Sequence, residues 1–264
     1  MNFINKEETK VSNSFIKKGF FIFDIKDKKN LNRIKKTIVK ISKDWINQRY
    51  KKKIKNFSLD KTHELIKVKD LNSFRLHVYE KINSYKWFSQ AYFSIAKKYL
   101  DIVCGNELVM QKKCNLSIQL PKDDSSILPL HSDVWVGDSE YEIVFWLPLV
   151  NVYNTKSMFI LPNEMNNKFA KKFFKYKSSD QLFRAVKPNL KWLKIDYGQG
   201  LLFTQNIMHG NVENQEPETR WSFNCRFKAI FSPYRDKRIG IFFKPITMKP
   251  VTKLGMLYKY PNEK

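Results

Sequence analysis

Two histidines and one aspartate constrain this chain more than any other feature of its sequence. His131 opens the tripeptide His131-Ser132-Asp133, and His209 follows 78 residues later. Side chains at alternate positions of a strand share a face, so His131 and Asp133 on one strand would both reach one ion while Ser132 points away. Two imidazoles and one carboxylate on one face of a metal, with other positions open, form the facial triad of non-haem iron(II) sites. The pattern therefore predicts a metal centre made from two distant segments.

The tripeptide alone is weak evidence, because His-x-Asp also arises where a surface histidine stands beside a loop or helix carboxylate. Its context strengthens the interpretation. His209 ends an apolar run at residues 200–204, which is typical of a buried strand that feeds a turn. Arg220 follows inside a second strand-like run, residues 219–231. Histidine is also scarce, with four in 264 residues, which makes a chance arrangement harder to obtain.

Segments spread over most of the chain carry a resemblance to a known family. They are residues 19–38, which begin Gly-Phe-Phe-Ile-Phe; 131–138, His-Ser-Asp-Val-Trp-Val-Gly-Asp; 142–149; 157–162, Ser-Met-Phe-Ile-Leu-Pro; and 220–227, Arg-Trp-Ser-Phe-Asn-Cys-Arg-Phe. With these motifs the chain resembles the phytanoyl-CoA dioxygenase superfamily of Fe(II)/2-oxoglutarate oxygenases. Within it, the bacterial oxygenases of carbohydrate and aminocyclitol gene clusters, the streptomycin-biosynthesis type included, are the most similar. Asn163 and Glu164 depart from the pattern, because many relatives have Gly-Ser there.

The resemblance implies an α+β fold with a double-stranded β-helix (jelly-roll) core and flanking N-terminal helices. The periodicity agrees: residues 29–50 have the apolar spacing of an amphipathic helix, 60–103 predict further helices, and strand-like alternation begins at Glu107. We expect a single domain over residues 1–264, helical over about 29–103 and jelly-roll over about 107–243.

Three further segments carry expectations of their own. Residues 1–14 predict no regular structure. Residues 163–194 form an insertion between the two halves of the metal site, where we expect a lid over the substrate. Residues 232–264 contain four prolines and are expected to wrap around the barrel or a partner subunit.

The resemblance implies Fe(II) held by His131, Asp133 and His209, which are then also the catalytic residues, and 2-oxoglutarate as cosubstrate. Chelation through its keto oxygen and one carboxylate leaves the far carboxylate in need of a cation. The planar fork of an arginine gives that carboxylate two parallel hydrogen bonds, which lysine does not. Because only eight of the 49 basic residues are arginines, Arg220 in a buried strand indicates that geometry matters there. Ser222, on the same strand face, is expected to donate to the same carboxylate.

Three other residues have two interpretations each. Gln119, in the strand-like run 114–120, is either a hydrogen-bonding partner of the cosubstrate or a satisfied core amide. Trp135 either faces the cavity, where its ring would stack on a sugar, or packs in the ordinary way. Arg226 pairs with an acidic residue or lies at a solvated strand end.

Composition indicates whether the chain is ordered, where it is located and what its charge means. Hydrophobic residues make up 42% of the chain, which excludes a disordered protein. Met1 to Lys10 is too polar for a signal peptide, and no apolar run is long enough to span a membrane. The three cysteines lack CxxC spacing, which indicates reduced thiols. We therefore expect a cytoplasmic protein. The net charge of +24 accompanies a bias towards Lys, Asn, Ile and Phe, so the base composition of the genome is the favoured explanation of the charge. An anionic substrate is the next explanation, ahead of nucleic-acid binding.

We therefore expect a dioxygenase that uses O2 to hydroxylate or oxidise a small polar metabolite, sugar-like or an aminocyclitol. Relatives that halogenate have a small residue where Asp133 stands, so the resemblance implies hydroxylation or further oxidation here. No nucleic-acid or membrane partner is expected, and the sequence leaves a homo-oligomer open. Two alternatives remain: a nucleic-acid demethylase of the alkylation-repair type, which shares the six-residue spacing of Arg220 and Arg226, and a non-enzymatic jelly-roll binding protein.

Overall fold

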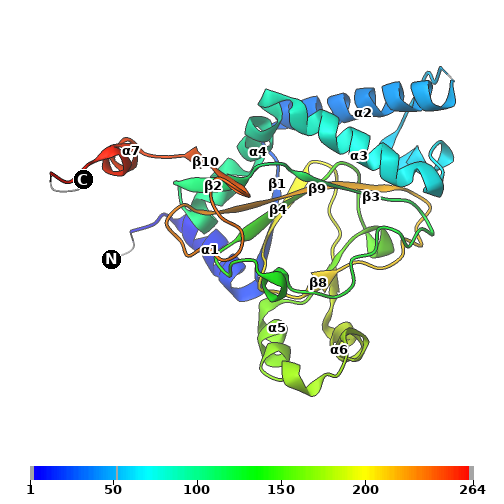
Figure 1. Ribbon diagram of the computed structural model, residues 1–264. Coiled ribbons are helices and arrows are strands. Elements are labelled where there is room, and N and C mark those ends of the chain that lie inside the picture. The colour runs from blue at the N-terminus through cyan, green and yellow to red at the C-terminus, as the bar shows by residue number, and fades with distance from the viewer. Residues whose placement is uncertain (1–2, 52, 262–264) are drawn as a thin grey trace.

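The structure, a computed structural model, describes residues 3–51 and 53–261. Helices from the first part of the chain cover one side of a large antiparallel sheet (Figure 1). A pair of short helices from the insertion, α5 (Asn163–Ala170) and α6 (Ser179–Val186), lies at the opposite end of the molecule (Figure 1). The metal-site motif lies between the helical layer and this pair of helices.

The first helix, α1 (Lys6–Lys18), lies where the sequence predicted irregular structure, so the prediction for residues 1–14 was wrong from residue 6 onward. The physical reason is strong capping. Asn5 Oδ1 accepts from the amide of Glu8 at 2.9 Å and Glu8 Oε2 accepts from the amide of Asn5 at 3.0 Å, a reciprocal capping box. Gly19, at φ 79°, ends the helix in the left-handed conformation that glycine adopts without strain.

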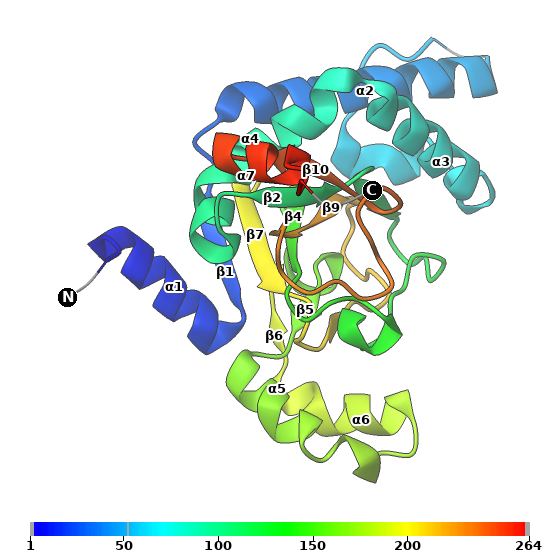
Figure 2. The same ribbon diagram turned by 60° about the vertical axis from the view of Figure 1, so that its left-hand side comes forward.

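The helical layer consists of a long helix, a short 3₁₀ helix and two further helices: α2 (Lys28–Tyr50), η1 (Leu59–Glu64), α3 (Val68–Ser84) and α4 (Lys86–Cys104). The predicted helix at 29–50 and the helical region at 60–103 are confirmed. Each long helix buries its apolar stripe, and the buried Leu31, Ile34, Ile38 and Ile41 of α2 follow one another at intervals of three to four residues. Figure 2 shows α2, α3 and α4 side by side above the sheet.

Within the described residues the strands form two antiparallel sheets, a seven-stranded and a three-stranded one. The larger sheet has the order β1-β7-β4-β9-β2-β10, with β3 also paired to β9. Its strands are β1 (Phe20–Asp24), β2 (Leu108–Gln111), β3 (Asn115–Gln119), β4 (Ile143–Pro148), β7 (Gln199–Thr204), β9 (Arg220–Ala229) and β10 (Phe243–Thr247). The smaller sheet consists of β6 (Lys191–Trp192), β5 (Phe159–Ile160) and β8 (His209–Gly210), in that order.

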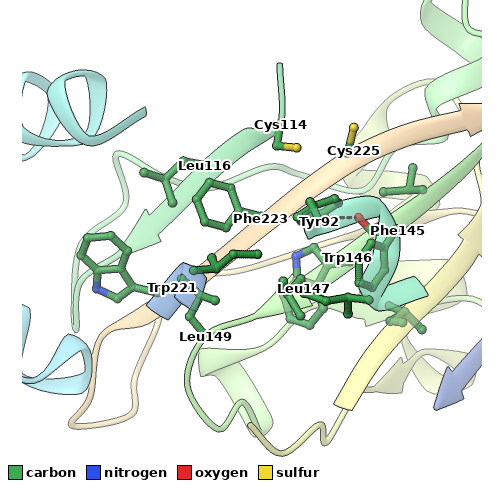
Figure 3. Packing of buried hydrophobic residues seen from close by; sticks show 14 of the residues in the cluster. Tyr92, Cys114, Leu116, Phe145, Trp146, Leu147, Leu149, Trp221, Phe223 and Cys225 are labelled. Carbon is green, nitrogen blue, oxygen red and sulfur yellow. Dashed lines mark hydrogen bonds between the residues drawn. The ribbon is translucent and has the colours of Figure 1, made fainter. Parts of the chain in front are cut away.

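Strand β9 shows how the sheet separates the core from the site. Its odd-numbered positions from Trp221 to Phe227 are fully buried on the helix side of the sheet. There the Phe223 ring lies 5.2 Å from the ring of Phe88 and the Trp221 ring lies 5.8 Å from that of Phe74. Figure 3 shows Trp221, Phe223 and Cys225 of β9 among the buried side chains of this core. The even-numbered positions from Arg220 to Arg226 line the cavity on the opposite face. Alternation along one strand thus makes an aromatic core and a polar cavity wall from the same ten residues.

The C-terminal segment partly follows its expected course. Strand β10 extends the large sheet by pairing with β2, so residues 243–247 lie against the body. Beyond it, the short helix α7 (Pro250–Leu257) has no buried residue and stands away from the sheet (Figure 1). No helix in the described part of the chain is long and apolar enough to cross a membrane.

Candidate active site

A cavity of about 360 Å³ lies between the two sheets. Its wall combines apolar side chains of β4 and β7 with polar side chains of β3 and β9, and both histidines of the predicted triad reach it. The polar side chains of this wall are those of Asn115, Ser117, His131, Asp133, His209, Asn211, Arg220, Ser222, Asn224 and Arg226.

The predicted metal ligands converge as the sequence indicated. One ligand atom from each of His131, Asp133 and His209 lies within 4.8 Å of the others. The two histidines form an isolated antiparallel bridge, in which each backbone amide donates to the other residue's carbonyl, at 3.0 and 2.8 Å. The expectation that Asp133 continues a strand was wrong, because it begins the 3₁₀ helix η2 (Asp133–Val136). Ser132 does point away, and its hydroxyl donates to the carbonyl of Gln205 at 2.8 Å.

The hydrogen bonds of the two imidazoles leave the right nitrogen free for a metal. His131 Nδ1 lies 2.7 Å from the carbonyl of Pro129, and His209 Nδ1 lies 3.0 Å from that of Ile207. A carbonyl only accepts, so in each ring Nδ1 carries the proton and Nε2 keeps its lone pair. Both Nε2 atoms face the Asp133 carboxylate, at 3.6 and 3.9 Å. Backbone carbonyls commonly orient metal-binding histidines in this way.

The electrostatics agree with this assignment. Burial lowers the pKa of His209 to about 4, so its imidazole is neutral at physiological pH. Burial would raise the pKa of Asp133, but the neighbouring imidazoles of His131 and His209 and the guanidinium of Arg226 lower it to about 2. Two imidazole lone pairs and an ionised carboxylate thus face one point, which is a donor set that suits a divalent iron.

Arg220 is a buried cation without an acidic partner in the described chain. It is 4% exposed, and its guanidinium donates to the Ser157 carbonyl and to Ser117 Oγ, each at 3.2 Å. Its Nε has no hydrogen-bond partner. Burial lowers the pKa of Arg220 to about 10, which still leaves it charged at neutral pH. A buried, unpaired arginine is costly, so this geometry fits an anionic ligand beside it.

Two buried hydroxyls lie near Arg220, and that of Ser222 lines the cavity. Ser222 Oγ and Ser157 Oγ are buried and have no hydrogen-bond partner among the described residues. Ser222 lies two positions along β9 from Arg220 and lines the same cavity. Unsatisfied buried polar groups are rare in native proteins and call for a ligand or a bound water. The guanidinium fork of Arg220, its free Nε and the free hydroxyl of Ser222 match the far carboxylate of a dicarboxylic acid, as expected for 2-oxoglutarate.

Two other predicted residues do not line the cavity. Gln119 is fully buried opposite Arg220 in the sheet, and its side-chain amide donates to the carbonyl of Val212 at 2.7 Å while its oxygen accepts from Asn211 at 3.4 Å. This placement favours the satisfied core amide over a cosubstrate ligand. Trp135 is 43% exposed, and its ring lies 4.8 Å from that of Phe173. It stands at the outer edge, next to Val136, which does line the cavity.

The predicted lid also lies outside the main cavity. No described residue of the insertion, 163–194, is part of the cavity wall, and the ring contact between Phe173 and Trp135 links it to η2. Its helix α6 instead borders a second hollow of about 180 Å³, which Phe183 and Leu130 line.

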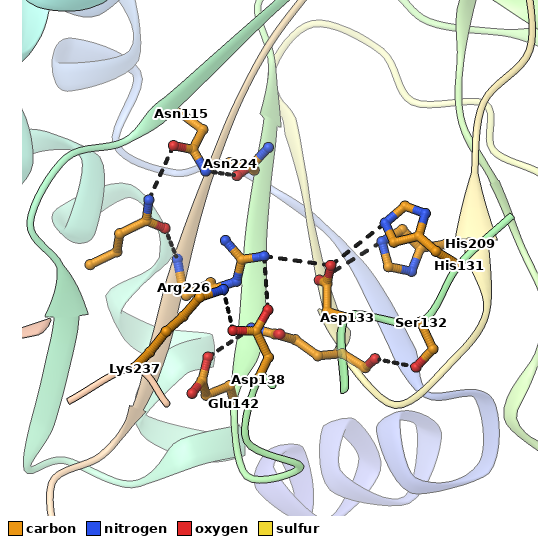
Figure 4. A network of polar contacts seen from close by, with 12 residues as sticks. Asn115, His131, Ser132, Asp133, Asp138, Glu142, His209, Asn224, Arg226 and Lys237 are labelled. Atoms are coloured by element: carbon orange, nitrogen blue, oxygen red, sulfur yellow. Dashed lines mark hydrogen bonds and ion pairs between the residues drawn. The ribbon is translucent and has the colours of Figure 1, made fainter. Parts of the chain in front are cut away.

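Some site residues were not assigned from the sequence. Asn115 and Asn224 face each other across β3 and β9, joined by a hydrogen bond of 3.0 Å, and both line the cavity (Figure 4). Arg226 was expected either to pair with an acidic residue or to lie at a solvated strand end, and the first interpretation is confirmed: it lies 3.5 Å from Asp133 and 3.1 Å from Asp138. The signal was present, because residues 220, 222, 224 and 226 must share one strand face once Arg220 is placed there. For Asp138, sequence alone gave no partner.

Comparison with known proteins identifies the fold. No protein-family model matches the chain, and no curated protein matches it significantly. Solved structures do match. The non-heme monooxygenase ThoJ, as its nickel complex, shares 15% identity, over 92% of this chain and 85% of its own, at a TM-score of 0.56. AviO1 from Streptomyces viridochromogenes shares 12% sequence identity, over 88% of this chain and 99% of its own, at a TM-score of 0.53. EctD from S. alaskensis with bound iron shares 13% identity, over 90% of this chain and 83% of its own, at a TM-score of 0.52. The chain shares their fold.

Proposed function

We propose that the protein is an Fe(II)- and 2-oxoglutarate-dependent oxygenase that acts on a small polar metabolite. The observation that carries the proposal is the presence, in one cavity, of the three converging ligand atoms and of a buried arginine without a carboxylate partner. A structural histidine cluster would not require the arginine, and an anion site would not require the triad. The similarity to ThoJ and to iron-bound EctD adds support at the level of the fold.

Each residue has a distinct role in this proposal. His131, Asp133 and His209 would hold the metal. Iron(II) with 2-oxoglutarate would supply oxidising power from dioxygen, with the cosubstrate converted to succinate and carbon dioxide. Arg220 and Ser222 bind the far carboxylate of the cosubstrate and so fix its orientation towards the metal. The apolar side chains of β4 and β7 exclude water around them.

The finer features of the proposal concern fold family and substrate. The two sheets form the double-stranded β-helix of one domain, of the phytanoyl-CoA dioxygenase type. The substrate is sugar-like or an aminocyclitol, as in the carbohydrate-cluster oxygenases. The paired amides of Asn115 and Asn224 support a substrate rich in hydroxyl or amine groups, because amides donate to and accept from such groups. The exposed ring of Trp135 is available for an outer contact with a sugar face.

Two measurements test the proposal. First, anaerobic titration with Fe(II) and then 2-oxoglutarate should give one iron per chain and a weak visible charge-transfer band. Second, sugar nucleotides, phosphorylated sugars and aminocyclitols are screened for stimulated release of succinate. A protein that binds neither iron nor 2-oxoglutarate would be the non-enzymatic binding protein. Succinate release stimulated by methylated DNA or RNA, with no response to carbohydrates, would instead establish the demethylase.

A further inference from the structure

A chain of charged side chains runs from the proposed metal ligand Asp133 to the C-terminal loop. Arg226 Nη2 lies 3.5 Å from Asp133 Oδ1 and 3.1 Å from Asp138 Oδ2 (Figure 4). The other oxygen of Asp138 pairs with Lys237 Nζ. We call these four residues, Lys237, Asp138, Arg226 and Asp133, the relay. It joins three parts of the fold: the segment of η2 and the turn after it, strand β9, and the loop at residues 231–242.

The burial of the relay shows that its pairing is required. The Asp138 side chain is completely buried, while those of Arg226 and Lys237 are 15% and 25% exposed. A buried carboxylate without cations is strongly destabilised, so Asp138 needs both partners. The positive charge of Arg226 is in turn compensated by two carboxylates. Arg226 is therefore poorly suited to bind an anionic substrate, unlike Arg220, which has no carboxylate partner in the described chain.

The position of Asp133 explains what the relay accomplishes. Both histidine ligands are fixed by the β-bridge between them, whereas Asp133 begins a 3₁₀ turn and has no ladder partner. Its carboxylate lies among the two imidazoles and Arg226, so the guanidinium is the contact that comes from the rigid strand β9. The loop also packs tightly against the end of η2: a Cβ on Gly137 would lie 2.0 Å from an Asp236 carboxylate oxygen.

We propose that Arg226 is a positioning residue for the metal-binding carboxylate of Asp133, and that Asp138 and Lys237 hold Arg226 in place. The C-terminal loop thereby contributes to metal affinity although it supplies no ligand. This inference rests on the proposed iron site and assigns residues that a facial triad does not itself require.

The test measures the affinity for Fe(II) alone, by anaerobic titration, so that it does not depend on turnover or on Arg220. Arg226→Met, which removes the charge at similar length, should weaken Fe(II) binding by about 10- to 100-fold, as is typical when a group that orients a metal ligand is lost. Arg226→Lys should restore part of that loss. Lys237→Met affects Asp133 only through Asp138 and Arg226, so it should decrease the Fe(II) affinity by a smaller factor.

The matched control is Arg235→Met, which breaks the exposed ion pair of Arg235 with Glu140 in the same loop. It should leave Fe(II) affinity unchanged. Addition of 2-oxoglutarate then supplies a spectroscopic signature, because a displaced Asp133 should shift the visible band of Arg226→Met relative to wild type. A purely structural role for Arg226 would lower the unfolding temperature without changing the affinity or band of the folded fraction.

The outcomes separate the relay from the iron site. Wild-type Fe(II) affinity and an unshifted band in folded Arg226→Met would overturn the relay and leave the iron site intact. Failure of the wild type to bind Fe(II) would overturn the proposed function itself. Should Arg226→Met not fold, Lys237→Met decides, because its side chain lies on the surface loop: unchanged Fe(II) affinity in that variant overturns the coupling.

Discussion

His131 and His209, 78 residues apart in the sequence, face each other across an antiparallel bridge in which each backbone amide donates to the other's carbonyl. Their ring centroids lie 4.4 Å apart. The backbone therefore positions both imidazoles before any metal binds, so the conformational entropy of these two residues is already lost on folding and not on metal binding. Preorganisation of this kind favours tight binding.

Loss of either imidazole should abolish iron binding at the triad. We expect His131→Ala and His209→Ala each to reduce bound Fe(II) well below one per chain in anaerobic titration, because two ligands hold iron much less tightly than three. His77→Ala is the control, since His77 is exposed on α3. Wild-type stoichiometry in both triad variants, with an intact visible band, would show that the assigned ligands are wrong.

Replacement of Arg220 should weaken binding of 2-oxoglutarate. Arg220→Lys keeps the charge but loses the planar fork, so affinity should fall by about 1–3 kcal/mol, the range for a charged hydrogen bond. Arg220→Ala should bind more weakly still. Isothermal titration with 2-oxoglutarate, after loading with Fe(II), measures the change. Unchanged affinity in Arg220→Ala would refute the anion site.

Substitution of Ser222 should change the affinity for 2-oxoglutarate without changing the stability of the fold. Its hydroxyl is buried without a protein partner, so Ser222→Ala removes no protein hydrogen bond and should not lower the free energy of unfolding. Affinity for 2-oxoglutarate should nevertheless fall by about 1 kcal/mol, the usual value of one hydrogen bond. Urea denaturation and ligand titration report the two quantities, with Ser84→Ala on the exposed end of α3 as control. Equal 2-oxoglutarate affinity in Ser222→Ala and wild type would contradict the assignment.

Thr62 anchors the helical layer to β9. Its buried hydroxyl accepts from Trp221 Nε1 at 2.9 Å and donates to the Leu59 carbonyl at 2.7 Å. Thr62→Val leaves both groups unpaired in the core and should destabilise the fold by about 1–3 kcal/mol in urea denaturation. Thr62→Ser keeps the hydroxyl and should cost less. If the serine variant were the less stable of the two, packing rather than hydrogen bonding would dominate at this position.

The carboxylate at position 133 predicts the reaction outcome. In the oxygenase family that the sequence resembles, halogenating enzymes have a small residue where a halide binds. Because this chain has Asp133 at that position, we expect hydroxylation of the substrate, or a further oxidation that begins with it. Once the substrate screen gives a hit, mass spectrometry after incubation under ¹⁸O₂ should show a heavier product for hydroxylation. Incubation under ¹⁶O₂ with added chloride is the control, and a chlorinated product would refute the expectation.

The sequence by itself determined the residue types and periodicities of the site. Scarce histidines at 131 and 209, an aspartate two positions along, and an arginine in an apolar run were sufficient to indicate the ligand set and the anion site. Strand alternation then predicted that Ser222 shares a face with Arg220, which the cavity lining bears out. These inferences depend only on local spacing, and local spacing is what a sequence records.

Only the tertiary structure decided which groups meet. Asp133 lies on a 3₁₀ turn rather than a strand, because the chain leaves the bridge at Ser132 to pack against the C-terminal loop. The Gln119 side chain donates a hydrogen bond to the Val212 carbonyl, and Arg226 forms ion pairs with Asp133 and Asp138. Such partners lie far apart in the chain, and a polar side chain pairs with whichever group the fold brings within about 3 Å. That proximity is a property of packing, which no single segment of sequence contains.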